Sequence, residues 1–212
     1  MSEAEARAWL ADHFDVSRET WERLEALVAA VVEENARQNL VAASTIPDIW
    51  QRHIVDSAQL LLYAKGAWMD LGSGPGFPGL VVAALTDQPM TLVESRRKRV
   101  EFLEGAVARM GLADRVSVEG RRLELVATRP FAVISARAFA PLDKLLALAH
   151  RFSTAETQWV LPKGRSAQDE LDQVRRTWQG VFRIEPSVTD PAAGVIVATD
   201  VRPRNIKPGK AR

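Results

Sequence analysis

The 212-residue sequence predicts an α/β protein in which helices cover both faces of a mostly parallel sheet. From residue 67 onward, apolar runs that suit buried strands alternate with stretches that suit helices, a pattern that gives right-handed crossovers between parallel strands. A glycine-rich turn joins the first strand to a helix. The last two apolar runs have no helix between them, which predicts an antiparallel hairpin at the edge of the sheet.

Residues 1–65 predict a helical extension that packs on the main domain. Ser2 and Glu5 match a capping box, and the first helix should continue to Phe14. The other two helices are expected over residues 17–39, with fraying from 35 onward, and over 47–63, with Pro47 in the first turn. No glycine- or serine-rich linker follows, so we do not expect an independent module.

The main domain is expected to span residues 66–201, followed by a basic tail at 202–212. Strands are expected at 67–71, 90–94, 115–119, 131–135, 157–161, 181–184 and 194–198. Helices are expected at about 78–86, 97–110, 141–148 and 167–178. Gly111 should end the second of these helices in the left-handed conformation.

Composition limits the possible classes of protein. The sequence has no cysteine, which excludes disulfides, thiolate metal sites and a cysteine nucleophile and suits the cytoplasm. The N-terminus is too charged for a signal peptide, and no apolar run is long enough to span a membrane. The net charge of +1 does not indicate a nucleic-acid binder, but residues 96–99, 121–122 and the tail are basic. These clusters either contact phosphates or form ordinary solvated surface.

The turn at residues 69–79 is the expected ligand site. Glycines at 72, 74, 76 and 79 let the backbone approach a ligand closely. Glu94 ends the second strand, where a carboxylate can accept hydrogen bonds from the two hydroxyls of a ribose. Alternatively, Glu94 is an acid at a helix start beside basic neighbours.

Two classes of cofactor are compatible with glycines at 74, 76 and 79. Their spacing matches the dinucleotide fingerprint, so a nicotinamide-dependent oxidoreductase is one alternative. Pro75 and Pro78 argue against it, because they remove backbone donors that a pyrophosphate would use. Asp70-x-Gly72-x-Gly74-x-Gly76 instead resembles motif I of class I S-adenosylmethionine-dependent methyltransferases, which have a Rossmann-like, seven-stranded sheet ending in an antiparallel hairpin.

Five motifs extend this resemblance over roughly residues 35–200. In order, they are Asn39-Leu40, Arg52-His-Ile-Val-Asp-Ser57, Asp70–Gly79, Arg137-Ala-Phe-Ala140 and Leu161-Pro-Lys-Gly164. Their succession resembles the RsmG (GidB) family of bacterial small-subunit rRNA guanine-N7 methyltransferases. The resemblance implies a monomeric cytoplasmic enzyme that uses S-adenosyl-L-methionine to methylate N7 of a guanosine in the 530 loop of 16S rRNA. Its partner would be the small ribosomal subunit.

The motifs also imply which residues form the site. The expected cofactor-site residues are Asp70, Gly72, Ser73, Gly74, Gly76, Phe77, Glu94, Leu123, Glu124 and Arg137. Candidates for positioning the target base are Arg137, Phe139 and Lys163, which lie near strand ends. No catalytic group or metal site is assigned, because guanine N7 has a free lone pair and no proton to lose. In-line positioning alone can contribute about 7–11 kcal/mol.

His53 and Asp56 lie three residues apart and should share one face of a helix. They either hold the N-terminal helices to the sheet or form a face that closes over the cofactor or contacts RNA. A ribosome-binding or assembly protein without catalytic turnover is a further alternative, because it would share the fold and the basic clusters.

Overall fold

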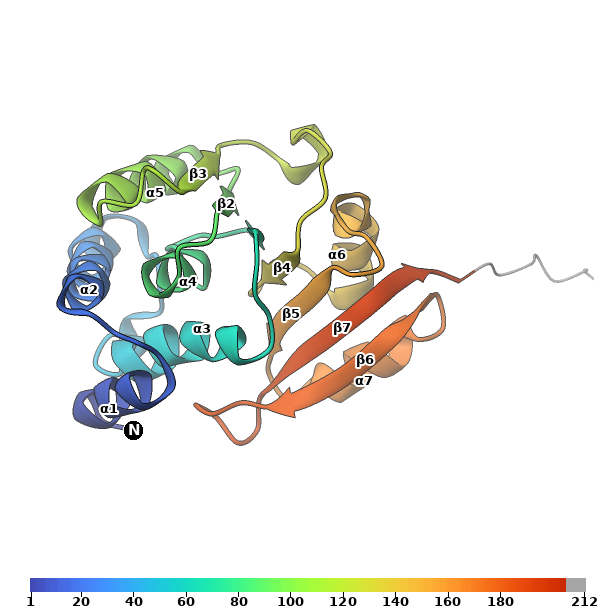
Figure 1. The fold of residues 1–212 in the computed structure, drawn as a ribbon, viewed down its shortest axis with the longest axis horizontal. Coiled ribbons are helices and arrows are strands. Elements are labelled where there is room, and N and C mark those ends of the chain that lie inside the picture. The colour runs from blue at the N-terminus through green and yellow to red at the C-terminus, as the bar shows by residue number, and fades with distance from the viewer. Residues whose placement is uncertain (205–212) are drawn as a thin grey trace, which may run out of the picture.

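A seven-stranded sheet organises the computed structural model, which describes residues 1–204 (Figure 1). The strands are β1 (Trp68–Leu71), β2 (Met90–Val93), β3 (Val116–Glu119), β4 (Val133–Ala136), β5 (Gln158–Lys163), β6 (Trp178–Pro186) and β7 (Gly194–Pro203). Their order in the sheet is β3-β2-β1-β4-β5-β7-β6. The first five strands pair in parallel and β7 is antiparallel to both of its neighbours, which confirms the predicted fold class and edge hairpin.

Helices cover both faces of this sheet (Figure 1). The longer ones are α1 (Glu3–His13), α2 (Arg18–Gln38), α4 (Gly79–Leu85), α5 (Arg97–Arg109), α6 (Leu142–Ala149) and α7 (Ala167–Val174). A composite helix consists of a π-helical segment η2 (Trp50–Val55), one turn of α3 (Asp56–Ala58) and the 3-10 turn η3 (Gln59–Leu62). Further 3-10 turns are η1 (Ala43–Thr45), η4 (Leu123–Leu125) and η5 (His150–Phe152). None of the helices described is long and apolar enough to cross a membrane.

The two faces of the sheet bury two separate cores. Trp68 of β1 packs with the N-terminal helices, α4 and α5, whereas Met69 and Leu71 face α6 and α7. Leu24 of α2 and Ile54 of η2 are fully buried in the first core. Each such side chain contributes about 1.5–3 kcal/mol when removed from water. The N-terminal helices are therefore part of the main core, as a packed extension requires.

The second helix is longer and more regular than the sequence predicted. The expected fraying from residue 35 is wrong: α2 continues to Gln38 and ends at Asn39, which adopts the left-handed conformation with φ +47°. The buried Asn35 side chain accepts a hydrogen bond from the Val41 amide at 2.8 Å. Asn35 therefore secures the chain just after the helix.

The third helix also departs from the prediction. Pro47 lies in a turn and not in the first helical turn, and helical structure begins only at Ile49. The segment that follows has π geometry instead of regular α geometry, which is often found near functional sites. The side chain of Arg137, which follows β4, reaches this segment and contacts the Arg52 carbonyl and the His53 ring.

The C-terminal hairpin is longer than expected, at the expense of α7. The predicted helix end at Trp178 is wrong, because α7 stops at Val174 and Trp178 begins β6 opposite Pro203. Trp178 is buried in the second core, which favours the strand. Arg202 and Pro203, expected in the tail, lie in β7, and the Arg202 side chain pairs with Asp200. The tail residues Lys207, Lys210 and Arg212 lie outside the described residues.

Candidate active site

Asp70, the last but one residue of β1, fixes the glycine turn through hydrogen bonds of its carboxylate. Its Oδ1 accepts a hydrogen bond from the Ser135 hydroxyl of β4 at 2.7 Å, and its Oδ2 accepts one from the Gly79 amide at 3.3 Å. Burial raises the pKa of Asp70, although these hydrogen bonds oppose the increase. Asp70 is fully buried and ties together the ends of β1 and β4 and the start of α4.

The start of α4 has few donors to offer an anion. The Gly79 amide is bonded to Asp70, and the Leu80 amide donates to the Gly76 carbonyl at 2.8 Å. Pro78, the residue before the helix, has no N–H. These contacts use the donors that would hold the pyrophosphate of a dinucleotide, which argues against the nicotinamide alternative.

A cavity of about 380 Å³, hereafter the smaller cavity, opens beside the carboxyl ends of β1, β2 and β3. It is lined by residues from four segments: Gly72 after β1, Val93–Arg96 and Arg99 around the β2–α5 junction, Arg121–Glu124 after β3, and Ala138–Ala140, Lys144 and Leu148 around α6. Its charged lining consists of five basic side chains and two carboxylates. The smaller cavity therefore carries an excess of positive charge.

Glu94 links the smaller cavity to the glycine turn. Its Oε2 accepts a hydrogen bond from the Gly74 amide at 3.2 Å, and its Oε1 accepts from the amides of Ser95 at 2.7 Å and Arg96 at 2.9 Å. A carboxylate has about four lone-pair positions, so one stays open on the cavity side after these three bonds. With the apolar Leu123 beside it, this arrangement fits the ribose and base of a nucleoside.

A second cavity of about 800 Å³, hereafter the larger cavity, lies on the other side of Ala138–Ala140. Its lining comes from η2 and α3, the loop after β4, the end of β5, α7 and the β6–β7 turn. The charged side chains are Arg52, Arg137 and Lys163 together with Asp56, Glu170 and Asp190. Basic and acidic groups are thus equal in number here.

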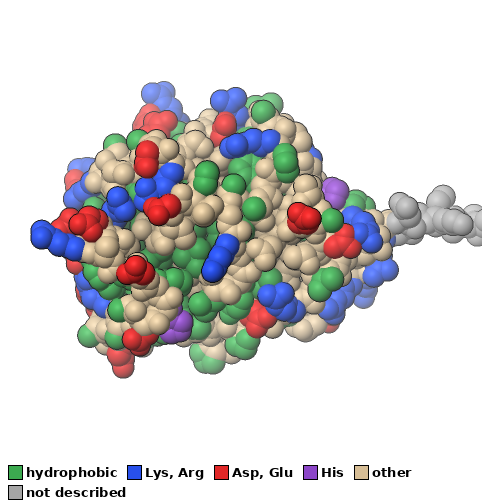
Figure 2. All heavy atoms as spheres, in the orientation of Figure 1, with side chains coloured by type: hydrophobic (Ala, Val, Ile, Leu, Met, Phe, Trp, Pro, Cys, Tyr) green, Lys and Arg blue, Asp and Glu red, His purple; other side chains and the backbone are tan. Residues whose placement is uncertain are grey.

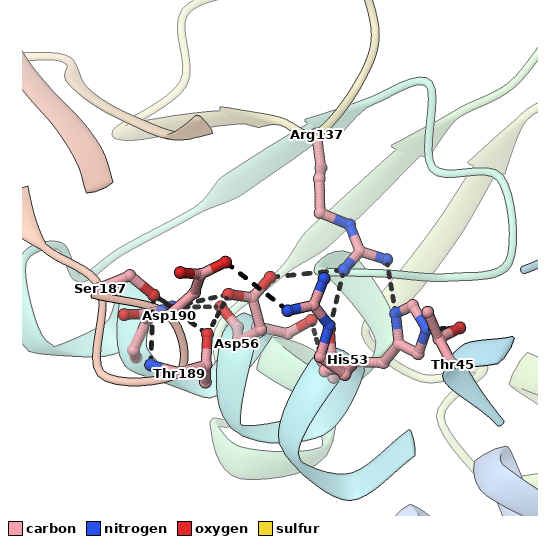
Figure 3. Close-up of polar contacts among 10 residues, drawn as sticks. Thr45, His53, Asp56, Arg137, Ser187, Thr189 and Asp190 are labelled. Atoms are coloured by element: carbon pink, nitrogen blue, oxygen red, sulfur yellow. Dashed lines mark hydrogen bonds and ion pairs between the residues drawn. The ribbon is translucent and has the colours of Figure 1, made fainter. Parts of the chain in front are cut away.

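Arg137 organises one side of the larger cavity (Figure 3). Its guanidinium donates to the Asp56 carboxylate at 3.4 Å and to Nδ1 of His53 at 3.2 Å. The same group lies 5.3 Å from the centre of the Phe77 ring. Arg137 therefore fastens the end of β4 to the N-terminal composite helix.

His53 is held in its neutral form. Burial, with the nearby charges of Arg137 and Arg52, lowers the pKa of His53 to about 3. Arginine can only donate, so Nδ1 must accept and Nε2 must carry the proton. Nε2 lies 2.9 Å from the Thr45 hydroxyl, which in turn donates to the Ala42 carbonyl at 2.8 Å. This chain of hydrogen bonds fixes the tautomer and the orientation of the ring.

Asp56 connects the same helix to the β6–β7 turn (Figure 3). Its Oδ1 accepts hydrogen bonds from the Thr189 hydroxyl at 2.9 Å and from the Gln59 amide group at 3.0 Å. Arg52 pairs with Asp190 at 3.7 Å. His53 and Asp56 therefore hold the N-terminal helices to the sheet, which is the first of the two alternatives considered for them, and both residues also line the larger cavity.

Lys163, on the opposite side of the larger cavity, is paired with Glu170 of α7 at 2.8 Å. The Glu170 carboxylate also accepts from the Leu142 amide at 3.1 Å and the Ser166 hydroxyl at 3.0 Å. Burial would raise the pKa of Glu170, but these hydrogen bonds and the Lys163 charge outweigh it, and the pKa is lowered. Lys163 also donates to the Ala140 carbonyl at 3.5 Å, so it is a positioned cation with one of its three donors still available.

Phe139 separates the two cavities, both of which it lines. Its ring lies over Gly72, where an added Cβ would come within 2.6 Å of the ring. Gly72, with φ +67°, is thus needed for this close approach as well as for the turn. Ala138, before Phe139, adopts φ +53°, a conformation that is strained for alanine.

The residues expected in the site fall into three groups. Those that line the smaller cavity are Gly72, Glu94, Leu123 and Glu124, and those that line the larger one are Arg137 and Lys163, with Phe139 in both. The third group is buried within the turn itself and lines neither cavity: Asp70, Ser73, Gly74, Gly76 and Phe77.

Phe77 was expected to line the cofactor site. It is only 2% exposed and stacks on His53 with ring centres 5.0 Å apart, outside the lining of both described cavities. Sequence reasoning did not find Glu170 or Thr189, which lie 7 and 133 positions from Lys163 and Asp56 respectively. Neither residue belongs to a local motif that could have indicated a role.

The sheet order and the cavities at its carboxyl edge define a class I S-adenosylmethionine-dependent methyltransferase fold. An O-methyltransferase from Bacillus cereus solved in complex with SAH superposes with a TM-score of 0.58 at 14% identity, covering 91% of this chain and 96% of that one. A SAM-dependent methyltransferase from Aquifex aeolicus has a TM-score of 0.58 at 11% identity, covering 73% of this chain and 93% of that one. At such identities the similarity concerns the fold.

Sequence similarity narrows the class to a family. Residues 20–190 match the GidB family model, described as rRNA small subunit methyltransferase G, and the chain belongs to this family. It is 58% identical to a ribosomal RNA small subunit methyltransferase G of Rhizorhabdus wittichii, over 96% of this chain and 95% of that protein. The protein of the same name from Zymomonas mobilis is 51% identical over 99% of both chains.

Proposed function

We propose that the protein transfers the methyl group of S-adenosyl-L-methionine to N7 of a guanosine in the 530 loop of 16S rRNA. Two cavities that meet at Ala138–Ala140, at the carboxyl ends of β1 and β4, are the observation that carries this proposal. One of them suits a nucleoside and the other has room for an extruded base. Membership of the family supplies the substrate class.

The smaller cavity is the proposed cofactor site. Glu94 would accept a hydrogen bond from a ribose hydroxyl at its remaining acceptor position, and Leu123 and Glu124 would lie beside the adenine. Gly72 would let the backbone approach the rest of the molecule. When bound, the cofactor supplies an electrophilic methyl group on a sulfonium. The remaining contribution of the chain is to bind, orient and exclude water.

The reaction needs no general base, because guanine N7 already has an in-plane lone pair. His53 is accordingly not placed to act as a base, because its Nδ1 lone pair accepts a hydrogen bond from Arg137 and its pKa is lowered to about 3. The residues around both cavities act by positioning, which can contribute on the order of 7–11 kcal/mol when reacting groups are well aligned.

Phe139 is the residue best placed to hold the target base. A guanine in a folded loop must be extruded to expose N7 to an active site, and aromatic side chains stack on such bases. Phe139 lies between the cavities, where a methyl group would pass from one to the other. Lys163 would donate to acceptors on the base or to a phosphate. Arg137 would keep the loop in place through Asp56.

We also propose that the chain acts as a monomer in the cytoplasm. All the groups discussed come from a single chain, with residues 1–65 supplying one wall of the larger cavity and residues 66–201 the rest. Light scattering should give the mass of one chain for the purified protein, and the mass of one chain plus one RNA for the complex. A dimer that is required for activity would contradict this part of the proposal.

The decisive experiment is to map the modified nucleotide. Small subunits that lack the modification are incubated with the protein and methyl-labelled S-adenosylmethionine, and N7-methylguanosine is located by chemical cleavage of the rRNA. Label at one guanosine of the 530 loop is expected. Folded protein that transfers no methyl group would contradict the proposal and favour a ribosome-binding protein without turnover.

Phe139→Ala sharpens this test. Base–aromatic stacking contributes about 1–3 kcal/mol, so kcat/KM should fall roughly 10- to 100-fold. The conservative control Phe139→Tyr, which keeps a ring, should recover most of the activity. The affinity for S-adenosylhomocysteine, measured by titration calorimetry, should change less than about threefold in both variants. Equal activity of Phe139→Ala and wild type would exclude the stacking role.

A further inference from the structure

Three basic residues at the mouth of the smaller cavity are not explained by the contacts described above. They are Arg96 after β2, Arg122 after β3 and Lys144 in α6, hereafter the basic rim. All three side chains are exposed, and none has an ion-pair partner among residues 1–204. The two other basic residues of this lining are paired: Arg99 with Glu94 at 3.9 Å and Arg121 with Glu119 at 3.0 Å.

The position of the basic rim indicates an anion that is larger than one carboxylate. Its three members come from three separate elements and converge on one opening, where like charges repel one another unless an anion binds. The cofactor brings a single carboxylate, which needs one or two of these cations at most. Figure 2 shows Lys and Arg side chains at several places on the upper part of the molecule, interspersed with acids, so the face in view does not form one positive field.

We propose that the basic rim binds phosphates of the rRNA backbone across the mouth of the smaller cavity, so that bound RNA closes over the cofactor. The inference rests on the proposed function, and it adds an order of binding. S-adenosylmethionine must enter before the RNA, and the protein can release S-adenosylhomocysteine only after the RNA has left. The charge-balanced larger cavity would receive the base, and the basic rim the strand beside it.

The order is tested by the release of tritiated S-adenosylhomocysteine from the full-length protein into excess unlabelled compound, with and without 16S rRNA. In wild type, saturating rRNA should slow the release by tenfold or more. In the triple variant Arg96→Gln, Arg122→Gln and Lys144→Gln, rRNA should slow the release by less than about twofold. The dependence of log affinity for rRNA on log salt should lose a slope of about 2 to 3, since each phosphate contact contributes about 0.7 to 0.9.

A matched control removes the same charge elsewhere. Arg18→Gln, Lys65→Gln and Arg176→Gln together alter three exposed cations outside both cavities. This variant should keep the rRNA-dependent slowing and most of the salt slope. An equal loss in both variants would show a general effect of charge and would overturn the proposal.

Two other outcomes would also overturn it without touching the proposed function. If the triple variant loses more than tenfold in affinity for S-adenosylhomocysteine without RNA, the basic rim holds the cofactor and not the backbone. Suppose that the wild-type protein methylates rRNA but releases S-adenosylhomocysteine at the same rate with and without rRNA. The mouth of the smaller cavity then stays open in the complex. Failure of the proposed function is a separate result, because wild type would then transfer no methyl group.

Discussion

The two cavities on either side of Ala138–Ala140 differ in how their charges are arranged. In the larger cavity, Arg52 and Arg137 each pair with a carboxylate far away in the sequence, and Lys163 pairs with Glu170 of the next helix. In the smaller cavity, Arg96, Arg122 and Lys144 have no such partner among residues 1–204. One cavity balances three basic with three acidic side chains, and the other sets five against two.

This difference distinguishes charged side chains that stabilise the structure from charged side chains that can bind a ligand. Ion pairs that bridge separate segments fix the geometry of a site before a ligand binds. A cation in such a pair is less available to bind the ligand itself. Unpaired, exposed cations contribute little to folding but remain available to an anion. On the proposed function, the larger cavity is preorganised for the target base, and the smaller cavity presents charge to its surroundings.

Removing Arg137 should have the largest effect on stability. Arg137→Met deletes hydrogen bonds to Asp56 and His53 and leaves a half-buried carboxylate with fewer partners. We expect the free energy of unfolding to fall by about 2–3 kcal/mol, the usual contribution of hydrogen bonds to charged groups. Methyl transfer should fall more than tenfold.

Arg52→Met is the matched control for this variant. The Arg52 side chain is 46% exposed and its contact with Asp190 is 3.7 Å long, so its removal should cost less than about 1 kcal/mol in urea unfolding. Equal costs for the two variants would show that the paired charges do not preorganise the larger cavity.

The neutral His53 makes stability depend on pH. Its pKa in the folded protein is about 3, below the ordinary value of 6.5, because of burial and the charges of Arg137 and Arg52. Between these two values the unfolded chain binds the proton and the folded protein does not, so stability falls as the pH falls from 6.5 toward 3. After allowance for solvent screening, the loss should be on the order of 2 kcal/mol.

His53→Asn removes this proton-binding group. The difference in unfolding free energy between wild type and His53→Asn should be constant above pH 7 and should change steadily as the pH falls below 6.5. A difference that stays constant from pH 7 to pH 4 would mean that His53 titrates equally in both states.

The fold was predictable because each element has a local signal. Strands buried on both faces read as short apolar runs, and the glycine turn at 69–79 and Gly111 mark where the chain must adopt positive φ. The predictions failed where a contact outside the element itself decided the structure. Asn35 keeps α2 intact by bonding past the helix end, and Trp178 joins β6 because it pairs with Pro203.

The sequence predicts which single residues of the candidate site lie at strand ends, but it does not predict which of these residues contact one another. Glu94 and Lys163 could be placed at the carboxyl ends of β2 and β5, where ligands bind in such sheets. The pairing of Lys163 with Glu170, and of Asp56 with Thr189, joins residues without any shared pattern in the sequence. Only the folded chain brings Phe77 beneath His53 and Arg137.

Breaking the second ion pair of the larger cavity should have a smaller effect. Glu170→Gln keeps an acceptor for the Leu142 amide but loses the charge opposite Lys163, so unfolding should become easier by about 1 kcal/mol. The lowered pKa of Glu170 means that the pair stabilises the protein above the ordinary glutamate value of 4.5 and is lost as the pH falls below it.

A double-mutant cycle with Lys163→Met, measured by urea unfolding at pH 7, isolates this interaction. The two single changes and the double change should cost similar amounts, since each removes the same pair. Fully additive costs would show that Lys163 and Glu170 stabilise the protein independently of each other.

The smallest effect on stability is expected at the smaller cavity. This prediction is the most direct test of the difference in charge pairing between the two cavities. Replacing Arg96, Arg122 and Lys144 together by glutamine should change the free energy of unfolding by less than about 0.5 kcal/mol, because exposed cations without partners contribute little. A small increase in stability is the more informative result, since it would report relief of repulsion among charges kept for a ligand. A loss comparable to that of Arg137→Met, in the same urea titration, would mean that the basic rim is held by contacts of its own. Charge pairing would then no longer distinguish the two cavities.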